Sequence, residues 1–225
     1  MNKFFIVFLF FVALISCSVN NTKEDNSLEK YFTENNLTGT FAFFNNGTGE
    51  FSIYNMGRYR DSAYLPFSSY NVVTSLIGLE TGRIKDSAEL IRTNFDSLTI
   101  GQDTVKHWLD TLGYNPQRVT ADEQLGLVKK LYFGQLPFQP RTQRIVKNAL
   151  KKEDNSNYIL SYETGSGVVK NTEQGWLAGW IEENKHPYFF VLHTESRDTT
   201  VNLVTAQEQI LKGILKQYDF LEGKR

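Results

Sequence analysis

Apolar residues recur at helical spacing in several stretches of the chain. In residues 68–80, SSYNVVTSLIGLE, Val72, Leu76 and Leu79 share one face, and Gly82 fits a helix C-cap. Gly113 closes a later amphipathic stretch in the same way. The pattern predicts helices over residues 28–33, 68–80, 104–112, 122–131, 141–150 and 205–218.

Other stretches have the composition of strands. Residues 40–45 and 50–54 are rich in aromatic residues and flank Gly47-Thr48-Gly49, which predicts a hairpin. Residues 55–65 are expected to form a loop. Three further strands are predicted over 158–164, 175–182 and 188–194, with a reverse turn at 183–185. The order of hairpin, helices, three-strand meander and helix indicates a mixed α/β (α+β) fold, an antiparallel sheet flanked by helices.

The first 17 residues, MNKFFIVFLFFVALISC, have the pattern of a secretory signal. Lys3 precedes an apolar run over residues 4–15 that is short for a membrane span. The ending Leu14-Ile15-Ser16-Cys17 resembles a bacterial lipobox, which implies cleavage before Cys17 and its lipidation. The alternative is an ordinary signal peptide with a chance cysteine.

These patterns predict a signal peptide over 1–16, a lipidated Cys17 with a flexible tether to residue 26, and one domain over 27–225. The expected location is the bacterial cell envelope, in the periplasm or at the outer membrane, with the lipid on Cys17 as the membrane anchor.

Composition narrows the classes of partner. The 225 residues are 40% hydrophobic, which suits one globular domain, and the formal net charge of −1 gives no field to attract nucleic acid. One cysteine excludes an intrachain disulfide. The three histidines, His107, His186 and His193, indicate no metal site, and no motif calls for a cofactor.

Three segments carry a shared set of motifs. Residues 64–82 read YLPFSSYNVVTSLIGLETG, residues 131–150 read LYFGQLPFQPRTQRIVKNAL, and residues 162–190 contain ETGSG, GWLAGWIE and YFF. In order and spacing they resemble the class D β-lactamases and related penicillin-recognising serine enzymes. The resemblance implies a β-lactamase/transpeptidase-like fold, with a shortened helical region here.

The resemblance places a nucleophile at Ser68. The family motif P-x-S-x-x-K corresponds to Pro66-Phe67-Ser68-Ser69-Tyr70-Asn71, so Asn71 occupies the position of the general-base lysine. A carboxamide cannot accept the serine proton. Ser68 has an alternative role as a helix N-cap.

The Lys-Thr-Gly strand motif of the family corresponds to Glu163, Thr164 and Gly165, the expected substrate-binding positions. Glutamate in place of lysine inverts the charge that would face the carboxylate of a penicillin or a cell-wall peptide. A solvated strand-end carboxylate is the alternative for Glu163.

Other family features are missing or altered. The S-x-V segment is absent, because only residues 83–103 separate the first helix from the next. The Ω-like loop is reduced to residues 116–118, and no arginine follows Asp198 before Lys224, where Leu203 is the rough position of the carboxylate clamp. Trp176 and Trp180 are expected in the core.

The leading hypothesis is an envelope lipoprotein with a class D β-lactamase-like fold that is catalytically impaired or inactive. It would bind a cell-wall peptide, a β-lactam or a protein partner. The second hypothesis is an active serine β-lactamase or slowly acylating penicillin-binding protein that uses Ser68 with a base from elsewhere, such as Glu163. The third is a purely structural envelope module.

Overall fold

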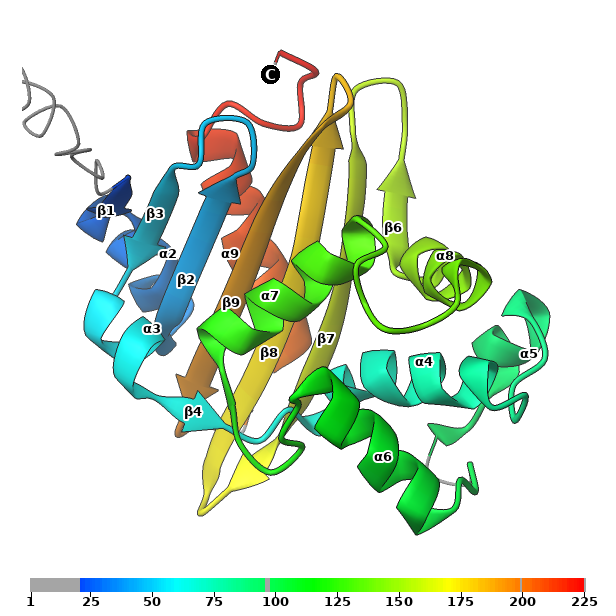
Figure 1. The fold of residues 1–225 in the computed structure, drawn as a ribbon. Coiled ribbons are helices and arrows are strands. Elements are labelled where there is room, and N and C mark those ends of the chain that lie inside the picture. Colours follow the sequence, from blue (N-terminus) through cyan, green and yellow to red (C-terminus); the bar gives the residue numbers. More distant parts are fainter. Residues whose placement is uncertain (1–20, 96–97, 199, 225) are drawn as a thin grey trace, which may run out of the picture.

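The computed structural model describes residues 21–95, 98–198 and 200–224. Its main element is a seven-stranded sheet in the order β1-β3-β2-β9-β8-β7-β6 (Figure 1). β1 pairs with β3 in parallel, and the other neighbours are antiparallel. The strands are β1 Thr22–Glu24, β2 Thr38–Asn45, β3 Phe51–Tyr54, β6 Lys151–Asp154, β7 Ile159–Val169, β8 Thr172–Glu183 and β9 His186–Ser196.

Helices cover both faces of this sheet. α9 (Leu203–Gln217) and the short α2 (Glu29–Thr33) pack on one face, and α7 (Ala121–Tyr132) crosses the other (Figure 1). The remaining elements are η2 Asn26–Leu28, α3 Met56–Asp61, β4 Ala63–Tyr64, η3 Phe67–Tyr70, α4 Asn71–Glu80, α5 Ser87–Arg92, α6 Gln102–Leu112, β5 Val119–Thr120 and α8 Pro140–Ala149. The alternation of side chains along the strands therefore divides the core into two clusters.

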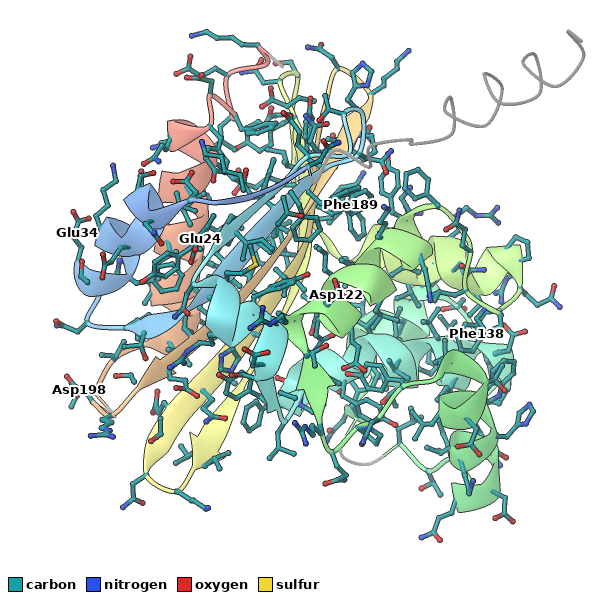
Figure 2. All side chains as sticks on the ribbon, turned by 60° about the vertical axis from the view of Figure 1, so that its left-hand side comes forward. Glu24, Glu34, Asp122, Phe138, Phe189 and Asp198 are labelled. Atoms are coloured by element: carbon teal, nitrogen blue, oxygen red, sulfur yellow. The ribbon has the colours of Figure 1, made fainter. Side chains whose placement is uncertain are left out.

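The cluster under α7 includes Trp176, Trp180 and Phe189, which point from the sheet toward the helices. Tyr59 of α3 donates a hydrogen bond to Asp122, with 2.7 Å between the oxygens. Asp122, at the start of α7, is labelled in Figure 2. Trp176 and Trp180 are both buried, which confirms their predicted place in the core.

Each of the two hairpin turns places an asparagine and a lysine in the left-handed backbone region. Asn184 and Lys185, between β8 and β9, have φ of 48° and 67°, and Lys170 and Asn171, between β7 and β8, have φ of 48° and 62°. Two consecutive positive φ angles give the turn twist that matches the right-handed twist of the strands. The reverse turn predicted at 183–185 is thereby confirmed.

The predicted fold class is confirmed, with differences in individual elements. Residues 55–65 do not form a loop: Asn55 caps α3 through its side chain, and Ala63–Tyr64 pairs with Val119–Thr120. β7 continues to Val169 through the glycines at 165 and 167. α5 and β6 are short elements with little apolar periodicity, which is why the sequence pattern did not predict them.

The structure describes only the last part of the predicted N-terminal segment, from residue 21 onward. β1 lies within the range expected as a tether, so the sheet begins before residue 27. The predicted signal segment and Cys17 lie outside the described residues. Within the part of the chain that is described, no helix is long and apolar enough to cross a membrane.

Candidate active site

Ser68 lies in η3, the turn of helix that leads into α4, and its side chain is exposed. Neither η3 nor α4 has a side-chain hydrogen bond at its N-cap, so the N-cap interpretation of Ser68 is wrong. The next residue fixes the turn instead. The Ser69 hydroxyl donates to the Pro66 carbonyl at 2.6 Å and accepts from Gln124 Nε2 of α7 at 2.9 Å. Ser68 is therefore presented to solvent by a buried hydrogen-bonded neighbour.

Strand β7 lies directly against this turn because two of its residues lack a side chain. A Cβ added at Gly165 would lie 2.2 Å from the Ser69 backbone nitrogen, and one at Gly167 would lie 2.4 Å from the Phe67 ring. Phe67 itself has φ of 50°, a conformation that costs energy for a bulky residue. The predicted site residue Gly165 is thus what allows β7 and the serine turn to touch.

We predict that Gly165→Ala destabilises the fold. The new methyl group would collide with backbone atoms that cannot rotate away, at an expected cost of about 3 kcal/mol in the free energy of unfolding. Gly126→Ala in α7 is the matched control, since a Cβ there meets nothing within 4 Å. It should stabilise by about 0.5 to 1 kcal/mol. Urea unfolding of both variants measures the difference, and equal midpoints would contradict the close packing.

The loop before the serine is held by an aromatic cluster. Trp176 Nε1 donates to the Leu65 carbonyl at 2.9 Å, and the Tyr64 ring stacks on His193 with 3.6 Å between centroids. His193 is fully buried, and neither ring nitrogen has a hydrogen-bond partner among the described residues. Burial, with a smaller contribution from the charge of Arg58, lowers the His193 pKa to about 3. The imidazole is therefore neutral and structural at neutral pH.

Asn71 and Glu163, the two positions of altered family lysines, line one cavity of about 280 Å³. Asn71 is the first residue of α4, and Glu163 projects from β7 on the same face as Gly165. Ser75, one turn after Asn71, adds a hydroxyl, and the other lining residues are apolar. Ser68 is not among the residues that line this cavity. The structure thus brings Asn71 and Glu163 together and leaves Ser68 outside.

The environment of Glu163 is unusual for a carboxylate. The side chain is half-buried, and no hydrogen bond or ion pair joins it to another described residue. Burial raises its pKa to about 7, and the charge of Lys152 on β6 partly offsets this. The alternative of a solvated strand-end carboxylate is wrong, because Glu163 lies in the interior of β7 and lines a mainly apolar cavity.

Thr164 lies on the other face of β7. Its register partner on β8 is Leu177, which belongs to the core beneath α9, and the adjacent Tyr162 donates to Glu208 of α9 at 2.7 Å. Of the three residues at the strand motif, only Glu163 and Gly165 face the serine turn and the cavity. The predicted substrate-binding set is therefore divided between the two faces of the sheet.

The short segment 83–103 supplies part of the cavity wall. Leu90 and Ile91 of α5 and Phe95 beyond it line the cavity, in the stretch where the S-x-V motif would be expected. Leu203, the rough position of the arginine clamp, is buried at the start of α9 beside Gly175. Within the described ranges, no group of three His, Cys, Asp or Glu side chains is placed to hold a metal ion.

Several residues of the site were not singled out from the sequence. Gln124 had no distinguishing pattern in its helix, and Leu90 and Phe95 lie in a segment without clear periodicity. Gly167 was quoted only as part of the ETGSG segment, and it lies within β7. The alternation of β7 was an available signal: it separates Thr164 from its two neighbours.

Comparisons with known proteins agree with this architecture. No family model matches the chain. It is 25% identical to β-lactamase OXA-48 of Klebsiella pneumoniae over 240 residues, 87% of this chain and 89% of that protein. The C-terminal domain of the Bacillus licheniformis BlaR penicillin-receptor superposes with a TM-score of 0.76 at 20% identity, covering 88% and 96% of the two chains. The class D β-lactamase YbXI from Nostoc gives 0.77 at 21%, covering 88% and 100%.

Proposed function

We propose that this chain, which has the class D β-lactamase-like, penicillin-recognising fold, is a cell-envelope lipoprotein that binds its ligand without hydrolysing it. One observation carries the proposal. Asn71 and Glu163 occupy the positions of the two family lysines and face a mainly apolar cavity, while Ser68 lies outside that cavity. The serine is retained, and the groups that would activate it are not.

The chemistry at these positions supports the loss of hydrolysis. A serine hydroxyl becomes an effective nucleophile when a neighbouring base takes its proton. Asn71 has no titratable group to do so. An ionised Glu163 repels the carboxylate that penicillins and cell-wall peptides carry, by on the order of 1 kcal/mol at 4 Å even in water. The site therefore lacks both a base to take the serine proton and a cation to hold the ligand carboxylate, and acylation of Ser68 needs both.

Binding without turnover suits a fold of this kind. Among the similar proteins, one is named a β-lactamase of class D and another is named a penicillin receptor. The fold thus occurs in proteins named for recognition as well as for hydrolysis, and function follows from the site. Candidate ligands here are a cell-wall peptide, a β-lactam or a protein partner.

A second candidate function is an active enzyme with Glu163 as the general base. The observation in its favour is the Glu163 pKa of about 7, which is suited to proton transfer at neutral pH. Against it, Ser68 does not line the cavity that contains Glu163. The third candidate, a structural module with a filled cleft, is disfavoured by the open space beside Asn71.

The test of the proposal is β-lactam turnover at high protein concentration. We expect penicillin loss to be the same with the native chain and with Ser68→Ala, because Ser68 is not activated. Turnover that disappears in Ser68→Ala would establish the active enzyme instead. For the lipoprotein part, cells expressing the chain should incorporate radiolabelled fatty acid into it, and Cys17→Ser should remove the label.

A further inference from the structure

We propose that the cavity beside Asn71 binds the ammonium end of an aminoalkyl chain, with Glu163 as its counter-ion. The inference rests on the proposed function, in which this site retains binding but not catalysis. It identifies the ligand class by charge and shape.

The shape of the cavity suits a slender aliphatic chain. Its volume of about 280 Å³ lies just below the range of roughly 300 to 1,000 Å³ that is usual for ligand pockets. Val72 from α4, Leu90 from α5, Phe95, and Val146 and Leu150 at α8 supply apolar walls. Ile91, 81% exposed, stands at the solvent side. Methylene groups entering from solvent would therefore contact hydrocarbon along their length.

The polar groups of the cavity suit a cation. Among the described residues that line the cavity, Glu163 alone carries an ionisable side chain, and the amide of Asn71 and the hydroxyl of Ser75 add neutral acceptors. A half-buried carboxylate without a partner is costly to ionise, and a bound ammonium would offset that cost. A ligand carboxylate would instead face the charge of Glu163.

Within residues 21–95, 98–198 and 200–224, no cationic side chain forms an ion pair with Glu163. Lys152 on β6 is the charged group that acts on Glu163, yet no ion pair joins them within 4.0 Å. The Lys152 ammonium lies 5.4 Å from the centre of the Tyr162 ring, and Tyr162 faces α9, on the opposite side of β7. The counter-ion position at Glu163 is therefore open to a ligand.

Protonation links binding to pH. Because burial raises the Glu163 pKa to about 7, the free site is largely neutral below that pH, and an ammonium would favour the ionised form. Among the described lining residues Glu163 alone is ionisable, and the charge that acts on it from outside the cavity is that of Lys152 on β6. Affinity should therefore rise with pH through 7 and then level off, with a proton released on binding near and below pH 7.

The experiment uses calorimetric titration of the full-length chain in non-ionic detergent with two probes, 1-aminopentane and Nα-acetyl-L-lysine methylamide. 1-Pentanol is the neutral control. We expect a dissociation constant of about 1 mM for the better probe at about pH 8, as few atoms are buried. The constant should be at least about tenfold weaker at about pH 5.5 or in Glu163→Gln.

Two further variants distinguish amine binding in the cavity from amine binding elsewhere on the protein surface. Glu173→Gln removes a partly buried glutamate on β8 outside the cavity and should leave binding unchanged. Ala149→Phe places a ring at the exposed edge of the cavity and should weaken both amines. Tighter binding of the lysine derivative would indicate that the natural ligand's ammonium belongs to a peptide side chain. Tighter binding of 1-aminopentane would indicate that it belongs to a free alkylamine.

The proposal is overturned if neither amine binds the native chain with a dissociation constant below about 10 mM. It is also overturned if Glu163→Gln binds the amines as tightly as the native chain does, or if the native chain binds 1-pentanol as tightly as the amines. These results are independent of turnover. If the amines do not bind and penicillin is not turned over, only this inference is contradicted. Penicillin turnover that depends on Ser68 would contradict the proposed function, whether or not the amines bind.

Discussion

Penicillin is expected to acylate Ser68 in a variant that carries both Asn71→Lys and Glu163→Lys. A lysine at 71 would stand one helical turn after Ser68, where partial burial and the second lysine lower its pKa and make the neutral base accessible. A lysine at 163 would provide the cation that the penicillin carboxylate lacks in the native site. Because a positioned general base contributes about 10²- to 10⁴-fold, we expect acylation to rise by at least about 100-fold.

Time-resolved labelling with a fluorescent penicillin measures this gain. Asn71→Gln is the matched control, since it lengthens the side chain at the same position without adding a base. Ser68→Ala on the double-variant background should abolish the label. A double variant that folds and remains unlabelled would contradict the assignment of the missing base and cation to these two positions.

The second large effect concerns stability at acid pH. His193 has an unperturbed pKa of 6.5, and burial lowers it to about 3 in the fold. Below 6.5 the unfolded chain binds a proton that the folded chain does not, so stability falls as pH decreases until it reaches the folded pKa. Between pH 6.5 and about pH 4 this one group should cost on the order of 3 kcal/mol.

The variant that tests this is His193→Phe, which keeps a flat ring between Tyr64 and Trp176 and removes the titration. Its free energy of unfolding should fall less steeply than that of the native chain below about pH 6.5. His186→Phe, at an exposed position of the same strand, should keep the native slope. Parallel curves for the native chain and His193→Phe would show that His193 is not held neutral by burial.

The sequence was sufficient to predict the architecture because its elements are strongly patterned. Helical spacing in residues 68–80 and the aromatic strands identified the layers, and three motif segments in order indicated the fold. The same motifs identified Asn71 and Glu163 as altered positions, and these two residues do meet in one cavity. Motif spacing is informative there because both residues lie in regular elements, Asn71 in the first turn of α4 and Glu163 in the middle of β7.

What the sequence did not predict depends on contacts between distant segments. The collision that Gly165 avoids is with the backbone of Ser69, almost 100 residues earlier in the chain. Gln124 is buried because it bonds Ser69, and no periodicity marks such a pair. The raised pKa of Glu163 likewise follows from walls contributed by α4, α5 and α8. The local preferences of a sequence segment carry no information on contacts between segments that lie far apart in the chain.

Intact mass after prolonged incubation with a penicillin measures whether Ser68 can be acylated. The fold keeps Ser68 exposed, and Asn71 stands where its base would be. We expect the native chain and Ser68→Ala both to keep their unmodified masses at high reagent concentration. A stoichiometric penicilloyl adduct on the native chain that is absent from Ser68→Ala would contradict it.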